Sequence, residues 1–178
     1  MRAAPGKARS VAPQRIAAIT LDERTVVRRS PAIEHERATA ITDLLKDNRF
    51  TPQSGRAGPF HLHLGIAENR LAMEIRASPN TTEDVPGGGP EGEPSETIVL
   101  PLAPFRRIVK DYFLVCESHY ESIRGHGLAR VEAIDVGRRS LHDEGSALLI
   151  ERLAGKVTID HDTARRLCRL VCVLHLRA

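Results

Sequence analysis

Two runs of alternating apolar and polar residues, separated by a turn of only two residues, constrain the fold more than any other feature. Large apolar residues occupy every second position across Phe60–Ile66 and again across Leu71–Ile75. An alternation with a period of two is typical of β-strands that bury one face. With Glu68-Asn69 as the turn, all of these apolar side chains fall on the same face of the sheet. We therefore predict an antiparallel hairpin over Phe60–Arg76.

Weaker signals add further strands and several helices. Arg15–Leu21 and Thr97–Leu102 read as strands, with Pro101 near an end or an edge, and Thr25–Arg28 either extends the first or pairs with it. Apolar residues at helical spacing predict helices from Pro31 to about Arg49, from Pro104 to Gly125, from Val131 to Gly155, and from a cap at Asp160 or Asp162 to His175. The predicted fold class is α+β: a small, mostly antiparallel sheet of about three to five strands, helices packed on one face, and a C-terminal half that is all helical.

The chain is organised as one domain. Its 178 residues are the size of an ordinary single domain. Residues 1–11 read as a flexible N-terminal tail, which leaves residues 12–178 as the α+β domain. Residues 78–95 are rich in Pro, Gly and acidic residues and offer almost nothing to bury. We therefore expect a mobile loop inside the domain at 78–95 rather than a boundary.

Composition excludes several classes of protein. Aromatic residues make up 3% of the chain and Trp is absent, while the net charge is only +3. Single-stranded nucleic-acid binders need aromatic stacking platforms and strong positive charge, so such a partner is not indicated. No apolar segment reaches the roughly 20 residues that cross a bilayer, and no signal peptide is visible. Three cysteines, an odd number, suit a reducing compartment, so we expect a cytoplasmic protein.

Small residues on the apolar helical faces indicate how the helices pack. Cys116, Cys168 and Cys172 all lie on apolar stripes, where a buried thiol packs as a small hydrophobic group. We therefore expect Cys168 and Cys172 to be buried rather than redox-active. Gly137 and Gly145 interrupt the third predicted helix and indicate a kink or a close helix contact.

Long segments of the chain resemble a known bacterial family. These segments are RIAAITLDE, IEHERA, LPLAPFRRIVKDYFLVCES, EAIDVGRRSLHDEGSALLIERLAGKV and DTARRLCRLVCVLHLR. In this order, from about Ala12 to Ala178, they are similar to Uncharacterised Protein Family number 0262 of the alphaproteobacteria. The stretch from Val85 to Glu96 looks like an expansion of a loop that is shorter in relatives. The resemblance implies a small cytoplasmic bacterial protein, and it carries over no catalytic residue and no cofactor.

The densest reactive cluster is Arg138-Arg139 followed by His142-Asp143-Glu144. On a helix, each arginine lies one turn before an ionisable residue, which is ion-pair spacing. The fragment LHDE after paired arginines is similar to the phosphoacceptor box of some sensor histidine kinases, in which a helical His accepts a phosphoryl group. No nucleotide-binding motif accompanies it. A solvated, salt-bridged helix face explains the same residues, and the phosphotransfer reading requires His142 to project into solvent.

Two other groups are candidate binding sites. Arg106, Arg107 and Lys110 lie near the start of a predicted helix, where backbone N–H groups and basic side chains attract anions. The same three residues also fit the solvated outer face of an amphipathic helix. His61 and His63 could supply two metal ligands on a strand, but no third ligand follows at diagnostic spacing, so we predict no metal site.

Two functional hypotheses remain open. The first is a non-enzymatic interaction or regulatory protein that uses a charged helical surface, with no cofactor and most simply a protein partner; a homodimer is compatible with it. The second is an enzyme or phosphotransfer factor centred on His142 with Arg138 and Arg139. A well-patterned core, dense surface charge and the lack of a catalytic motif favour the first.

Overall fold

The structure is a computed structural model that describes residues 13–25, 31–78, 95–123 and 128–175. The predicted tail at 1–11 lies outside the described residues. So do positions 79–94 of the predicted loop and 26–28 of the segment at Thr25–Arg28.

The main sheet contains the predicted hairpin. Its strands are β1 (Ile16–Leu21), β3 (Phe60–Ala67), β4 (Arg70–Ala77) and β5 (Glu96–Pro101), in the spatial order β1-β3-β4-β5. β3 and β4 pair in the predicted register, with Leu64 opposite Met73 and His63 opposite Glu74. β5 lies antiparallel to β4 and ends at Pro101, whereas β1 runs parallel to β3. The sheet is therefore mixed but mostly antiparallel, which confirms the predicted α+β class.

A second, two-stranded sheet pairs β2 (Phe50–Pro52) antiparallel with β6 (Val157–Ile159). The sequence does not predict either strand, because three residues are too few to show an alternation. β6 also places a short strand between the helices that follow β5, where the sequence predicts only helices. The next helix begins directly after it, where the Thr163 N–H donates to Asp160 Oδ1 at 2.8 Å. Asp160 is therefore the N-cap residue.

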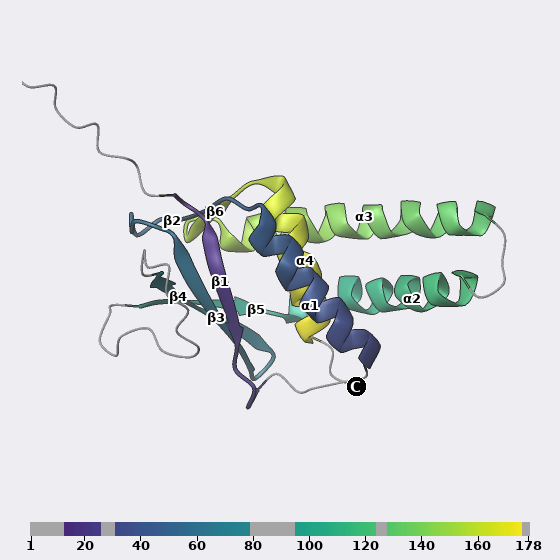
Figure 1. Ribbon diagram of the computed structural model, residues 1–178, viewed down its shortest axis with the longest axis horizontal. Coiled ribbons are helices and arrows are strands. Elements are labelled where there is room, and N and C mark those ends of the chain that lie inside the picture. The colour runs from purple at the N-terminus through teal and green to yellow at the C-terminus, as the bar shows by residue number, and fades with distance from the viewer. Residues whose placement is uncertain (1–12, 26–30, 79–94, 124–127, 176–178) are drawn as a thin grey trace, which may run out of the picture.

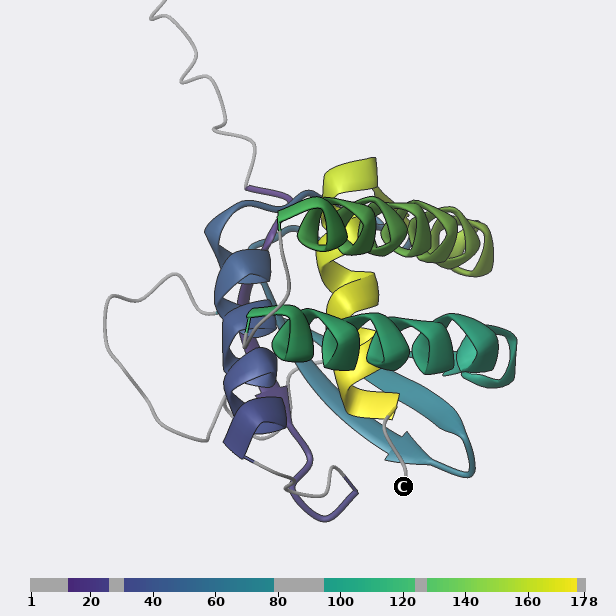
Figure 2. The same ribbon diagram turned by 90° about the vertical axis from the view of Figure 1, so that its right-hand side faces the viewer.

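The helices are α1 (Pro31–Lys46), α2 (Arg106–Ile123), α3 (Leu128–Leu153) and α4 (His161–His175), with a short 3₁₀ turn at Ala103–Phe105 leading into α2. α1 and α4 lie side by side against one face of the sheet, and α2 and α3 form an antiparallel pair beyond them (Figures 1 and 2). The far part of the α2–α3 pair extends away from the sheet (Figure 1). Within the described part of the chain, no helix combines the length and apolar character needed to span a membrane.

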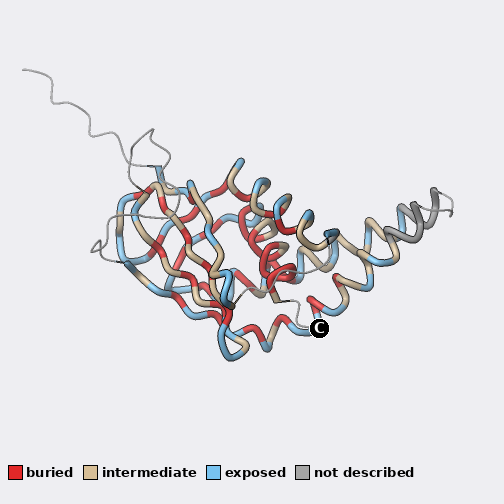
Figure 3. The backbone as a smooth tube through the Cα atoms, turned by 60° about the horizontal axis from the view of Figure 1, so that its bottom comes forward, coloured by how far each residue is buried: buried red, intermediate tan, exposed pale blue. Residues whose placement is uncertain are grey.

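The core lies between the sheet and the helices. Along β3 and β4 every second side chain is buried, because their apolar face is covered by helices. α4 is buried on nearly all sides, from Thr163 and Ala164 through Leu170, Val173 and Leu174. The sequence predicts only one inner face for this helix, but α4 lies between the sheet and the α2–α3 pair and is covered from both directions (Figures 2 and 3). Buried residues become sparse toward the far part of α2 and α3 (Figure 3).

Candidate functional site

The three residues of the predicted basic cluster at the start of α2 do not share one environment. Arg107 turns toward α3, where it donates to the Glu144 carboxylate, and it also donates to Asp111 Oδ2 at 3.3 Å. Arg106 and Lys110 are exposed and line a hollow of about 540 Å³. Neither of them forms an ion pair with any residue that the structure describes. Arg107 therefore stabilises the α2–α3 contact, and only Arg106 and Lys110 are free to meet a ligand.

The hollow combines a basic rim with an apolar floor. It is lined by Asn69 from the β3–β4 turn, Arg106, Val109, Lys110, Phe113, Leu114 and Glu117 from α2, and His175 from the end of α4. Leu114, which belongs to this lining, is 53% exposed. The surface therefore offers both apolar and positively charged side chains to solvent.

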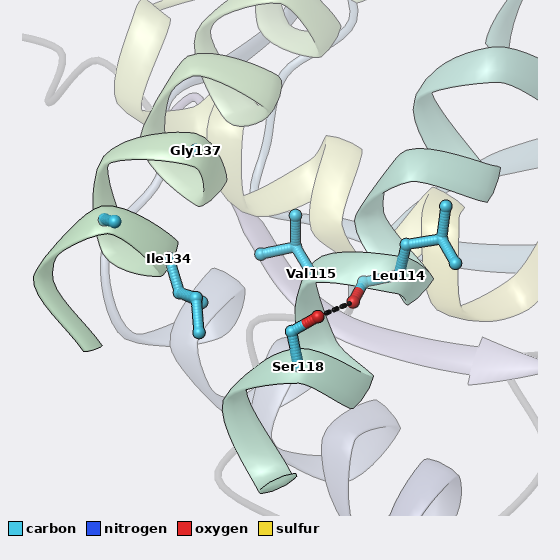
Figure 4. A pocket seen from close by; sticks show the side chains of 6 residues that line it. Leu114, Val115, Ser118, Ile134 and Gly137 are labelled. Carbon is cyan, nitrogen blue, oxygen red and sulfur yellow. Dashed lines mark hydrogen bonds between the residues drawn. The ribbon is translucent and has the colours of Figure 1, made fainter. Parts of the chain in front are cut away.

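A second hollow, of about 310 Å³, meets the first at Leu114. It lies between α2 and α3 and is lined by Leu114, Val115, Ser118, Ala133, Ile134 and Gly137 (Figure 4). The Ser118 hydroxyl donates to the Leu114 carbonyl oxygen at 2.9 Å, so it is occupied within its own helix (Figure 4). The lining is consequently almost entirely apolar. The two hollows together form one surface along α2.

On its opposite side α2 contributes to a polar network that joins three helices. The Tyr112 hydroxyl of α2 and Arg169 Nε of α4 both donate to Glu36 Oε1 of α1, each at 2.8 Å. Arg169 Nη1 also donates to Asp43 Oδ2 of α1 at 2.8 Å. Burial opposes ionisation of Glu36, but the hydrogen bonds from Arg169 and Tyr112 outweigh it and lower the pKa of that carboxyl. Burial likewise raises the pKa of Tyr112, so the phenol remains a donor. This network holds α1, α2 and α4 together.

His142 lies beside this network and does not project freely into solvent. Its ring packs on the Tyr112 ring with centroids 5.6 Å apart, and its Nε2 atom is buried. Burial, with a further contribution from Arg165, Arg138 and Arg169, lowers the pKa of His142 to about 4. The imidazole is therefore neutral at physiological pH, and its Nε2 atom lacks the access that phosphotransfer to or from another protein requires.

The charged neighbours of His142 form other pairs than their spacing within α3 indicates. Arg138 donates to Asp135 at 3.0 Å, one turn earlier in α3. Asp143 lies 4.0 Å from His161 Nε2 of α4, and Glu144 accepts from Arg107. Arg139 is exposed and forms no ion pair with the described residues, although it lies one turn before Asp143. Asp143 and Glu144 are instead used in contacts between helices.

The two histidines of β3 lie on the sheet face opposite the core. Thr20 Oγ1 of β1 is 2.9 Å from His61 Nε2 and 2.9 Å from His63 Nδ1, so one hydroxyl bridges both rings. Burial, followed by the nearby Arg76 and His63, lowers the pKa of His61. Among the described residues, no three His, Cys, Asp or Glu side chains converge in a way that could hold a metal ion. The arrangement is a hydrogen-bonded polar sheet face.

Cys168 and Cys172 are each 1% exposed, which confirms their predicted burial. Burial raises the pKa of the Cys116 thiol, and a hydrogen bond with Cys168 together with burial raises the pKa of Cys172. Reactive cysteines have the opposite shift. These thiols therefore contribute to packing.

Sequence reasoning identifies Arg138 and His142 but misses the residues that surround them. Tyr112 lies within the apolar stripe of its helix, and Glu36 and Arg169 lie among polar residues that are usually solvated. A signal for α4 does exist, because Arg165 and Arg169 are four residues apart on one side of that helix. Spacing within one helix cannot show which residues of the other helices they meet.

The comparisons with known proteins place the chain in a family. It is 55% identical over 159 residues to a UPF0262 protein of Rhodospirillum rubrum, covering 89% of this chain and 91% of the relative. It is 53% identical over 161 residues to a UPF0262 protein of Rhodopseudomonas palustris, with 90% and 91% covered, and 52% identical over 162 residues to one of a Bradyrhizobium strain, with 90% and 89% covered. No solved structure matches the chain. Residues 13–177 match the sequence profile of the uncharacterised protein family UPF0262, and the chain belongs to that family.

Proposed function

We propose that this protein is a non-enzymatic interaction or regulatory protein of the bacterial cytoplasm, and that it binds a protein partner through the outward face of α2. We call this surface the α2 face and define it by Arg106, Lys110, Phe113, Leu114 and Glu117. The single observation that carries the proposal is the meeting of two hollows at an exposed Leu114. A contiguous apolar surface with a polar rim is typical of protein-binding sites.

The chemistry of the α2 face specifies the partner. Phe113 and Leu114 offer neighbouring apolar side chains, and Arg106 and Lys110, which form no ion pair with a described acid, add positive charge toward the start of the helix. A helix or strand with apolar residues on one side and Asp or Glu at its edge matches both properties. Nucleic acid fits less well, because Glu117 lies in the same hollow and two cations neutralise few phosphates.

The cysteine chemistry agrees with a reducing compartment. Cys116, Cys168 and Cys172 are all free thiols, and disulfides are rare in the cytosol. The alternative function, phosphotransfer at His142, gains no support from the position of its buried Nε2 atom.

Substitution of Leu114 tests the proposal. We expect tagged wild-type protein, expressed in an alphaproteobacterial host, to recover a protein that Leu114→Glu does not recover. The control is Ile150→Glu, which changes a 37% exposed aliphatic residue on α3 and not on the α2 face. Circular dichroism at matched concentration checks that each variant is folded. Recovery of the same proteins by Leu114→Glu as by the wild type would refute the α2 face as the binding surface.

The charge requirement is tested separately with the purified partner. Lys110→Glu should reduce the association rate and remove most of its dependence on ionic strength, because rim charges act mainly on encounter. An association rate that does not respond to either Lys110→Glu or salt would exclude an acidic partner. A second copy of this chain is the other possible occupant of the α2 face, and sedimentation velocity tests for it. A wild-type dimer that Leu114→Glu converts to a monomer would show that a second copy binds there.

A further inference from the structure

Two buried nitrogen atoms between α3 and α4 lack a partner. Within the part of the chain that the structure describes, neither His142 Nε2 nor Arg165 Nε has a hydrogen-bond partner, and both atoms are buried. Native proteins satisfy most buried polar side-chain atoms, because an unmade hydrogen bond in a dry environment is costly. Water or a ligand from outside the protein chain can complete such atoms.

The crossing of α3 and α4 brings these two side chains to the same place. His161, Arg165 and Cys168 follow one another along the side of α4 that faces α3. His161 contacts Asp143, and the Cys168 thiol lies directly against Gly145. His142 lies one turn before Gly145 in α3, and Arg165 lies one turn before Cys168 in α4, so the Gly145–Cys168 contact puts both side chains on the facing sides of the two helices. The electrostatics agree, because Arg165 acts on His142 more strongly than any other charged group.

Positive charge exceeds negative charge around the His142 ring. The charges that act on the ring come from Arg138 and Asp143 of α3 and from Arg165 and Arg169 of α4. The ring also packs against the neutral Tyr112 of α2. The Arg169 charge is compensated by Glu36 and Asp43, and Arg138 is paired with Asp135. The acid nearest to Arg165 is Asp162, which is 4.0 Å away with a side chain that is 68% exposed. Arg165 therefore remains the least compensated cation next to a neutral imidazole.

We propose that His142, Arg165 and Arg138 form a binding site for the phosphate group of a small metabolite. A neutral imidazole with its proton on Nε2 donates one hydrogen bond, and each guanidinium can donate two. A tetrahedral phosphate has enough oxygen acceptors for all of them, whereas a carboxylate has two. Binding is non-covalent, and no bond to the phosphorus atom forms or breaks. Arg138 and Arg165 have side chains that are 43% and 42% exposed, so their flexible ends form the entrance.

This site is distinct from the α2 face. His142 and Tyr112 lie on the inner side of α2, whereas Arg106, Lys110 and Leu114 lie on the outer side. A ligand at His142 contacts the residues that pack α2 against α3 and α4. Phosphate binding can therefore act on the helix pair that presents the α2 face, without occupying that face.

The test is a titration of the His142 ring, followed by NMR of the full-length protein, with inorganic phosphate as the probe and a buffer free of phosphate as the reference. We expect phosphate to raise the pKa of His142 by about one unit or more, because a bound dianion stabilises the imidazolium. Arg165→Gln should raise that pKa in the absence of phosphate, since it removes the strongest cation, and should weaken phosphate binding by about tenfold. The matched control is Arg152→Gln at the exposed C-terminal end of α3, which should change neither quantity.

Three outcomes would overturn the inference. The first is a His142 signal that does not respond to millimolar phosphate. The second is an Arg165→Gln variant that binds phosphate as tightly as the wild type, or that leaves the pKa of His142 unchanged without phosphate. The third is an equal response to acetate, which would show a general anion effect rather than a phosphate site.

Discussion

At the scale of single residues, the contact between α3 and α4 depends on the absence of a side chain at Gly145. A Cβ atom built there would overlap the Cys168 sulfur and would lie 3.4 Å from Ile108 Cγ2. Cys168 is almost completely buried and its side chain is short, so it has little freedom to move aside. Gly137, two turns earlier in the same helix, has no atom within 4 Å of its Cβ position. Of the two glycines that interrupt the helical pattern, Gly145 is the one that marks a close helix contact.

Alanine substitutions at these two glycines should therefore have opposite effects. Gly145→Ala is expected to lower the free energy of unfolding by about 1–3 kcal/mol through overpacking. Gly137→Ala should raise it by about 0.5–1 kcal/mol, because alanine is the better helix former and finds open space. Urea denaturation of both variants measures the difference. A Gly145→Ala variant as stable as Gly137→Ala would mean that α3 and α4 do not approach as closely as the structure has them.

Single residues also show where sequence reasoning stops. The burial of Cys168 and Cys172 follows from their place on an apolar stripe, so it could be predicted. The bond from Arg169 to Glu36 joins residues 133 positions apart, and the bond from Tyr112 to Glu36 joins residues 76 apart. No local pattern selects such partners, because they depend on the order in which four helices pack. The proposed phosphate site therefore becomes visible only in three dimensions.

At the scale of secondary-structure elements, the β3–β4 hairpin could be predicted in full, because its alternation and its two-residue turn allow one register. The parallel pairing of β1 with β3 could not, since the alternation of apolar side chains does not encode strand direction. β2 and β6 are too short to carry a pattern. The burial of α4 on nearly all sides could not be predicted from its amphipathic sequence either. The helix is covered both by the sheet and by α2 and α3.

The hairpin turn offers a prediction at this scale. Glu68 and Asn69 have φ angles of 49° and 58°, which are the left-handed values of a type I′ turn. Asn adopts this conformation readily, and Glu does not. Glu68→Asn should therefore stabilise the protein by about 0.5–1 kcal/mol, measured by thermal or urea unfolding. Glu68→Gln removes the same charge without relieving the backbone and should change little. Equal stabilisation by both variants would point to charge rather than to turn geometry.

At the scale of the whole molecule, one half of the α2–α3 pair packs against the core and the other half extends away from it. The sheet, α1 and α4 enclose the core, and the first part of α2 and the last part of α3 pack against them. The far part of the pair extends from this body and carries the hollow at Leu114 (Figures 1 and 4). Residues that face the body, His142 among them, consequently report on folding, whereas the exposed Arg106, Lys110 and Leu114 of the α2 face can be changed with little effect on stability. This division lets a stability measurement and a binding measurement address different parts of the molecule.

His142 should make the stability of the whole fold depend on pH between 7 and 5. Its pKa is about 4 in the folded protein and about 6.5 in an unfolded chain. In this window the unfolded state therefore binds more protons, and the folded state loses stability as the pH falls. The expected loss from His142 between pH 7 and pH 5 is about 1–2 kcal/mol, and His61, whose pKa is also lowered, acts in the same direction.

Urea denaturation at both pH values, in a buffer without phosphate, measures this loss. His142→Gln should remove the part that His142 contributes, whereas the control His35→Gln, on the exposed side of α1, should leave it in place. A wild-type protein equally stable at pH 7 and pH 5, or a pH dependence as large in His142→Gln as in the wild type, would mean that the imidazole is solvated and not packed against Tyr112.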